Sequence, residues 1–344
     1  MEIFESCVNI AFMMLASFFL LTRLIPQKEK NMRTDHVKLA HLSALEKISL
    51  SRPLAERMRP KTLDEITGQE KAIFALKAAL FGRYPRHVIL YGPPGVGKTT
   101  AARLIFDSAI QSAQSPFSKN APFVEMDASL IRFDERGIAD PLIGSVHDPI
   151  YQGAGEKGRM GIPQIKEGAV TRAHGGVLFL DEIGEMHPME MMRLLKVMED
   201  GLVRFESAYY DKNQSEMDEY TKRAFEKGLP ADFRLIAATT RPPSALAPAL
   251  RSRATQIFFD ELTDKDKAKI AYSAAKRAGI KLSWESCLQI GKNAANGRSA
   301  VNIVELSMGA AAADGQKSVG ARHVKWAIDM FGDRNESLSD SKYA

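Results

Sequence analysis

A glycine-rich run between an apolar segment and a helix-forming segment is the feature that most constrains how this chain folds. The run reads GPPGVGKT from Gly92 to Thr99, and it follows the apolar residues 87–91. Glycines let backbone N–H groups approach an anion closely, and the first turn of a helix adds a partial positive charge. A strand, a loop and a helix in this order therefore predict a phosphate site at the edge of a parallel α/β sheet.

Each polar position of this run, which fits G-x-x-x-x-G-K-[ST], has a role in phosphate chemistry. Lys98 is expected to reach the β and γ phosphates of a nucleoside triphosphate, and the hydroxyl of Thr99 to bind a magnesium ion. The alternative is a Gly/Pro turn that only begins a helix, and the strand-loop-helix context disfavours it. The predicted nucleotide contacts in this segment are Gly92, Pro93, Pro94, Gly95, Val96, Gly97, Lys98, Thr99 and Thr100.

Two carboxylates follow a second apolar segment. Residues 177–180 read VLFL, and Asp181 and Glu182 come directly after them. Ligands bind at the carboxyl edge of a parallel sheet, so Asp181 is expected to hold the magnesium ion, and Glu182 to polarise the attacking water. An exposed acidic turn is the alternative for this segment alone. Beside the phosphate loop, the two carboxylates predict a site that hydrolyses a triphosphate.

The distribution of apolar segments predicts two folded domains. Further strands are expected at residues 123–126 and 233–238, with helices between the strands, which indicates a parallel sheet with helices on both faces. Beyond residue 259 the chain reads as Ala-rich helices, including 264–278 and 300–313. We therefore expect a large α/β domain over 51–258, a small all-α domain over 259–331 and a flexible tail over 332–344.

The N-terminus is predicted to be a membrane anchor. Residues 7–25 are almost wholly apolar, near the short end of the roughly 17–25 residues that span a bilayer. Basic residues follow this run and none precedes it, which places the rest of the chain on the cytoplasmic side of a bacterial-type membrane, with a single-pass anchor over 1–25 and a linker over 26–50. A buried or interfacial helix and a cleaved signal are the alternatives. The two cysteines, Cys7 and Cys287, support neither a disulfide framework nor a Cys-rich metal site.

The spacing of the phosphate loop and the acidic strand, together with the segment LIAATTR at 235–241, resembles the AAA+ ATPases. The resemblance implies ATP and Mg²⁺ as ligands and a ring of identical subunits, expected to be a hexamer. It also implies that Thr240 is a polar sensor, and that Arg253, with Arg251 as the alternative, reaches the ATP of the neighbouring subunit. Arg298 is implied to contact the γ phosphate from the helical lid, and Ile66 and Gly68 to pack on the adenine.

Two further segments narrow the resemblance. Residues 133–149 and 168–176 are similar to the ATPase module of the membrane-anchored B-type Lon proteases. Members of that family carry a Ser-Lys protease domain after the lid, and no residues of this chain match it, so we expect an ATPase without its own peptidase site. The alternative is a subunit of an ATP-dependent protease whose protease domain is on a separate chain or has been lost. The Gly-rich residues 150–161, with Tyr151, are expected to grip substrate in the ring pore or to form a plain surface loop.

The sequence is compatible with three classes of function. The leading expectation is a membrane-tethered motor that unfolds or remodels a protein substrate. A nucleic-acid motor is the second class, but the net charge of +5 is spread along the chain without a long basic run. A nucleotide-binding scaffold without turnover is the third, and it has no need of a water-polarising acid at Glu182 or of Arg253.

Overall fold

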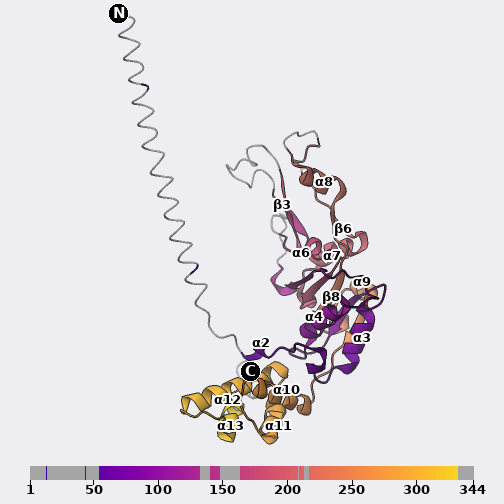
Figure 1. The fold of residues 1–344 in the computed structure, drawn as a ribbon. Coiled ribbons are helices and arrows are strands. Elements are labelled where there is room, and N and C mark those ends of the chain that lie inside the picture. Colours follow the sequence, from indigo (N-terminus) through magenta and orange to yellow (C-terminus); the bar gives the residue numbers. More distant parts are fainter. Residues whose placement is uncertain are drawn as a thin grey trace, which may run out of the picture. The chain divides into compact units, whose positions relative to one another are not determined.

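The computed structural model describes residues 13, 43, 54–131, 140–147, 163–207, 209–212 and 217–331 (Figure 1). The chain divides into two units, 1–53 and 54–344, and the fold described below is that of the second. The predicted anchor and linker, apart from Met13 and Ser43, lie outside the described residues, as do residues 150–161 and the tail. Among the described residues, no helix combines the length and the apolar character that crossing a membrane requires.

A parallel sheet forms the centre of the second unit, as predicted, and it has five strands. Its strands lie in the order β2-β5-β8-β1-β9, and every adjacent pair is parallel. The strand β9 at one edge was not predicted from the sequence. The bounds are β1 His87–Tyr91, β2 Phe123–Asp127, β5 Val177–Asp181, β8 Arg234–Thr239 and β9 Ala254–Phe258.

Helices cover both faces of this sheet, also as predicted. One face, which includes Leu90 and Phe179, packs against α3 and α4. The opposite face, which includes Ile89 and Leu178, packs against α6, α7 and α9. Burial on both sides explains why the central strands read as continuous apolar runs rather than alternating ones. The helix bounds are α3 Glu70–Leu80, α4 Lys98–Ala109, α6 Ala169–Arg172, α7 Pro188–Asp200 and α9 Pro248–Arg253.

Two antiparallel hairpins are added to the sheet-and-helix core, and neither was predicted as strands. β3 (Gly144–His147) pairs with β4 (Gln164–Glu167), and β6 (Leu202–Val203) pairs with β7 (Leu229–Pro230). The segment that connects β6 to β7 contains α8 (Glu219–Lys227). Both hairpins lie on the same side of α7 in the chain trace (Figure 1). The strands are too short for their alternation to be recognised in the sequence.

The helices after β9 form a separate apolar cluster, as the Ala-rich sequence predicted. Small side chains such as Ala271 and Ala300 let these helices approach one another closely. The first helix begins with a capping box between Thr263 and Asp266. The short helix α2 (Leu54–Arg57) joins this cluster, because the Leu54 N–H donates to Glu305 Oε1 at 3.0 Å. The bounds are α10 Asp264–Arg277, α11 Trp284–Asn293, α12 Gly297–Ala313 and α13 Ala321–Phe331.

Candidate active site

The predicted phosphate loop connects β1 to α4. Gly92, Gly95 and Gly97 all have positive φ angles, of 151°, 73° and 100°, which L-residues with a side chain rarely adopt. Gly97 is the residue that precedes the first turn of α4, so the N–H groups of that turn face the loop. The backbone of this segment therefore requires the glycines that the motif supplies.

The side chain of Lys98 folds back over the loop. Its ammonium donates to the carbonyl oxygens of Gly92 at 2.7 Å and Pro93 at 3.0 Å. Burial lowers the pKa of Lys98, and the nearby carboxylates of Glu182 and Asp181 oppose that shift. A buried ammonium that donates to two carbonyl oxygens is positioned to exchange them for phosphate oxygens, which carry full negative charge.

The acidic residues of β5 lie beside this loop. The hydroxyl of Thr99 donates to Asp181 Oδ2 at 3.4 Å, which joins α4 to the end of β5. Oxygens that share one magnesium ion at about 2.1 Å each lie about 3–4 Å apart, so this oxygen pair fits the ion. Asp127, the last residue of β2, is in register with Asp181, so it lies at the same edge of the sheet.

Glu182 has a strained backbone and a fixed side chain. It is the one non-glycine residue with positive φ among the described residues, at 47°. Its carboxylate oxygen Oε2 accepts from the N–H of Thr240 at 3.3 Å and from the Thr240 hydroxyl at 3.2 Å. Strain of this kind persists where the surrounding contacts enforce it, and it is frequent at catalytic positions. The structure thus brings the predicted base and the predicted sensor together.

The predicted adenine contacts lie between the loop and the helical domain. Ile66 is buried, and its Cγ2 atom lies 3.8 Å from the position where a Cβ would stand on Gly97. Gly68 lies against α10, because a Cβ there would meet Asp266 Oδ2 at 2.9 Å. Each residue therefore lies beside one of the two elements that an adenine between loop and lid would contact.

The contact between Gln69 and Asp260 was not predicted from the sequence. The buried side chain of Gln69 donates to the carbonyl oxygen of Asp260 at 2.8 Å, and its Oε1 accepts from the Asp260 N–H at 3.2 Å. The paired bonds attach the segment before α3 to the segment that leads from β9 into the helical domain. A lone glutamine carries no pattern that signals such a contact in the sequence.

The helical domain touches the phosphate loop through the start of α12. Asn296 caps this helix by accepting from the Ser299 N–H at 2.9 Å, and its side chain lies only 2.7 Å from the position of a Cβ on Gly95. A Cβ on Gly297 would stand 3.1 Å from the Gly95 carbonyl oxygen, so this residue also lies close to the loop. Arg298 follows and is exposed. The predicted lid arginine is thus one residue from a direct contact with the loop.

The two arginines at the end of α9 differ in surroundings. Arg251 donates from Nε to the Leu246 carbonyl oxygen at 3.3 Å. Arg253 donates from Nη1 to the Ala249 carbonyl oxygen at 3.0 Å and forms an ion pair with Glu199 of α7. Within the described part of the chain, neither Arg253 nor Arg298 forms a hydrogen bond or ion pair with the cluster around Lys98.

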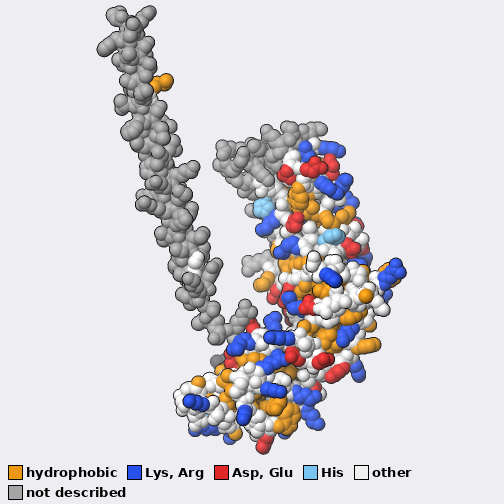
Figure 2. Space-filling view, in the orientation of Figure 1, with side chains coloured by type: hydrophobic (Ala, Val, Ile, Leu, Met, Phe, Trp, Pro, Cys, Tyr) orange, Lys and Arg blue, Asp and Glu red, His pale blue; other side chains and the backbone are white. Residues whose placement is uncertain are grey.

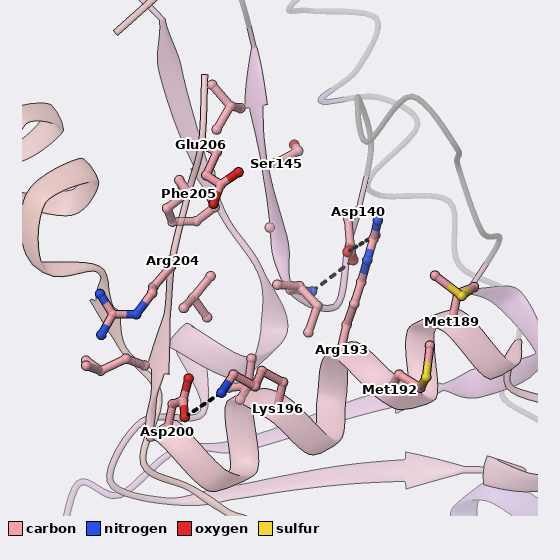
Figure 3. Close-up of a pocket in the computed structure, with 16 residues that line it drawn as sticks. Asp140, Ser145, Met189, Met192, Arg193, Lys196, Asp200, Arg204, Phe205 and Glu206 are labelled. Atoms are coloured by element: carbon pink, nitrogen blue, oxygen red, sulfur yellow. Dashed lines mark hydrogen bonds and ion pairs between the residues drawn. The ribbon is translucent and has the colours of Figure 1, made fainter. Parts of the chain in front are cut away.

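A cavity of about 620 Å³ lies apart from all of these residues (Figure 3). It is bounded by β3, α7 and the extended residues after β6, and it contains none of the predicted site residues. Arg193 of α7 spans part of it and pairs with Asp140 at 3.4 Å and with the buried Glu190 at 3.2 Å. Burial and the neighbouring Asp140 raise the pKa of Glu190.

The fold and the cluster at the end of β1 and β5 define a P-loop nucleoside triphosphatase. The profile of the ATPase family associated with various cellular activities (AAA) matches residues 88–262, and the chain belongs to this family. That range contains the phosphate loop, both carboxylates, Thr240 and Arg253.

Among curated proteins, the chain is similar to Lon protease 2 of Bacillus subtilis (strain 168). The two are 50% identical over 307 residues, which is 87% of this chain and 56% of that relative. The chain therefore spans little more than half of the relative's length. A second similar protein is the Holliday junction branch migration complex subunit RuvB of Campylobacter fetus, which is 26% identical over 294 residues, 84% of this chain and 72% of the relative.

Solved structures share the fold. The RuvB branch migration motor of Thermotoga maritima superimposes with a TM-score of 0.52 at 22% identity, over 79% of this chain and 72% of that one. NtrX from Brucella abortus in complex with ADP gives a TM-score of 0.51 at 21% identity, over 88% and 62% of the two chains. At these identities the likeness concerns the fold alone.

Proposed function

We propose that this protein hydrolyses ATP and uses the energy to unfold or remodel a protein substrate. The observation that carries the hydrolytic part is the contact of Glu182 with Thr240 beside the phosphate loop, because a protein that only binds nucleotide has no need of a fixed carboxylate there. The likeness to Lon protease 2 supports a protein as the substrate.

The hydrolytic step assigns one role to each residue of the cluster. Lys98 binds the β and γ phosphates, and Glu182 takes the proton of the attacking water as that water approaches the γ phosphorus. Thr240 positions the Glu182 carboxylate through its two hydrogen bonds. Thr99 and Asp181 are the residues that would hold a magnesium ion, which supplies charge neutralisation at the phosphate oxygens.

The remaining predicted residues complete the site from outside this cluster. Arg253 is proposed to enter the site of the neighbouring subunit in a homo-oligomeric ring, expected to be a hexamer, with Arg251 as the alternative. Arg253 is exposed whereas Arg251 is only partly exposed, which supports Arg253 over Arg251 for a contact with another subunit. Arg298 is proposed to contact the γ phosphate from the lid, and the contact of Asn296 with Gly95 supports that placement.

The setting of this ATPase is also a proposal. The apolar residues 7–25 support an anchor in a bacterial-type cytoplasmic membrane, with the ATPase domain over 51–258 and the lid over 259–331 on the cytoplasmic side. The alternative proposal is that this ATPase works as part of a protease, with a Lon-type peptidase site on a separate chain. The cytoplasmic side supplies the ATP that the site requires.

A nucleic-acid motor is the second candidate, because one similar protein is named as a subunit of a Holliday junction complex. Against it, basic side chains on the face shown in Figure 2 are interspersed with acidic and apolar ones. Neutralisation of phosphates by Lys and Arg side chains supplies much of the affinity of a protein for nucleic acid. A face on which basic and acidic side chains are mixed supplies less of this attraction.

The test is the ATPase rate of the full chain, purified in detergent, with and without unfolded casein. We expect casein to raise the rate and neither single-stranded nor double-stranded DNA to do so. The Lys98→Ala variant serves as the control and is expected to remove the activity under all conditions. If DNA raised the ATPase rate and casein did not, the proposed protein substrate would be wrong and the nucleic-acid motor would be favoured.

A further inference from the structure

The ion pair between Arg253 and Glu199 joins two helices that have separate connections to the active site. Glu199 lies in the last turn of α7, and α7 follows the short helix η4 (Ile183–Glu185) that begins directly after Glu182. Arg253 is the last residue of α9. The pair therefore connects the helix that follows the predicted base with the arginine proposed to act on the neighbouring subunit.

The surroundings of Glu199 favour this pairing. The last turn of α7 contains no basic residue but has Glu199 and Asp200 near its carboxyl end, where the helix dipole disfavours negative charge. Asp200 is paired with Lys196 of the same helix at 3.1 Å, as Figure 3 shows. Glu199 instead obtains its counter-charge from Arg253 of another helix.

The pair is also weak enough to be exchanged. The Arg253 side chain is 39% exposed and that of Glu199 is 45% exposed, so solvent screens their attraction. Exposed ion pairs contribute little, whereas an arginine binds phosphate oxygens through two parallel, charge-assisted bonds. A terminal phosphate presented by a neighbour would therefore compete successfully with the Glu199 carboxylate.

We infer that Glu199 is a positioning residue, which holds Arg253 against its own subunit until the ATP of the neighbouring subunit competes for the guanidinium. The inference depends on the proposed role of Arg253 in the neighbouring site. In the absence of that phosphate, Arg253 stays bound to Glu199 and to the Ala249 carbonyl oxygen. Glu199 thereby lowers the fraction of subunits whose arginine is available for hydrolysis.

The experiment compares the steady-state ATPase of Glu199→Gln with that of the wild-type full chain. Loss of an exposed ion pair is expected to raise kcat by about two- to fivefold. The KM for ATP should change less, since ground-state binding is assigned to the phosphate loop. The difference between the two proteins should shrink as salt is added, because salt screens the wild-type pair. Asp200→Asn removes the same charge one residue away and is expected to keep the wild-type kcat.

Two further proteins separate this inference from the proposed function. In an Arg253→Ala background, where kcat is expected to fall at least about tenfold, Glu199→Gln should have no further effect. If Arg253→Ala itself keeps the wild-type kcat, the proposed role of Arg253 is wrong. If Arg253→Ala lowers kcat while Glu199→Gln leaves it unchanged or lowers it, only the positioning role of Glu199 is refuted. An equal rise in kcat with Asp200→Asn would also refute that role.

Discussion

Acid is expected to destabilise the central sheet through His87, the first residue of β1. The ring nitrogen Nδ1 of His87 accepts from the Leu235 N–H of β8 at 3.0 Å, which requires that nitrogen to be unprotonated. Burial lowers the pKa of His87 from 6.5 to about 4, and the positive charge of Arg234 adds to the shift, while Asp232 opposes it. The folded protein therefore binds a proton at His87 less readily than the unfolded chain does.

The magnitude follows from these two pKa values. Between about pH 6.5 and pH 4 the unfolded chain binds more protons at this site, so the stability that the neutral ring contributes is present above pH 6.5 and is lost as the pH falls. The full shift corresponds to about 3 kcal/mol in the free energy of unfolding, of which about 2 kcal/mol is lost by pH 5.

The assay is urea unfolding of the wild type and of His87→Asn at about pH 7.5 and pH 5. The Asn side-chain oxygen keeps an acceptor near the position of Nδ1 but does not titrate, so the variant should lose about 2 kcal/mol less than the wild type on acidification. His174 offers a matched control, because its Nδ1 accepts from the Asp232 N–H at 3.0 Å but the residue is exposed. Equal acid sensitivity of wild type and His87→Asn would refute the reasoning.

Two other substitutions test contacts around the loop. Gly95→Ala should weaken binding of a fluorescent ATP analogue by at least about tenfold, because a Cβ there meets Asn296 at 2.7 Å and the φ angle is 73°. The control is Gly309→Ala, which has open space around the added Cβ and should bind the analogue normally. Gln69→Leu leaves the Asp260 N–H and carbonyl oxygen unpaired and should lower the free energy of unfolding by about 1–3 kcal/mol, measured with urea. Normal ATP binding by Gly95→Ala, or unchanged stability of Gln69→Leu, would contradict these contacts.

Those parts of the fold that depend on local sequence pattern were predictable. The strands at 87–91 and 177–181 each contain four consecutive buried residues, and the helix from Lys98 follows the phosphate loop directly. β9 was missed because its residues, ATQIF, form the exposed edge of the sheet and include only one fully buried side chain. An edge strand requires less apolar sequence than a central one.

The candidate site likewise combines residues that a local sequence pattern reveals with contacts that it does not reveal. The loop and the carboxylates form contiguous motifs that the sequence displays, whereas the contact of Asn296 with Gly95 joins residues that are far apart in the sequence. The pairing of Glu199 with Arg253 likewise depends on how α7 and α9 pack against the sheet. Such contacts between distant segments are decided by tertiary packing, which a single sequence does not display.

The Glu182→Gln variant tests the central claim most directly. The amide keeps the size of the side chain and can still accept from Thr240, but it cannot take a proton from water. We expect the variant to bind ATP with wild-type affinity and to hydrolyse it at least about a hundredfold more slowly, as loss of a general base predicts. A wild-type rate of hydrolysis in Glu182→Gln would contradict the assignment of this cluster as the catalytic site.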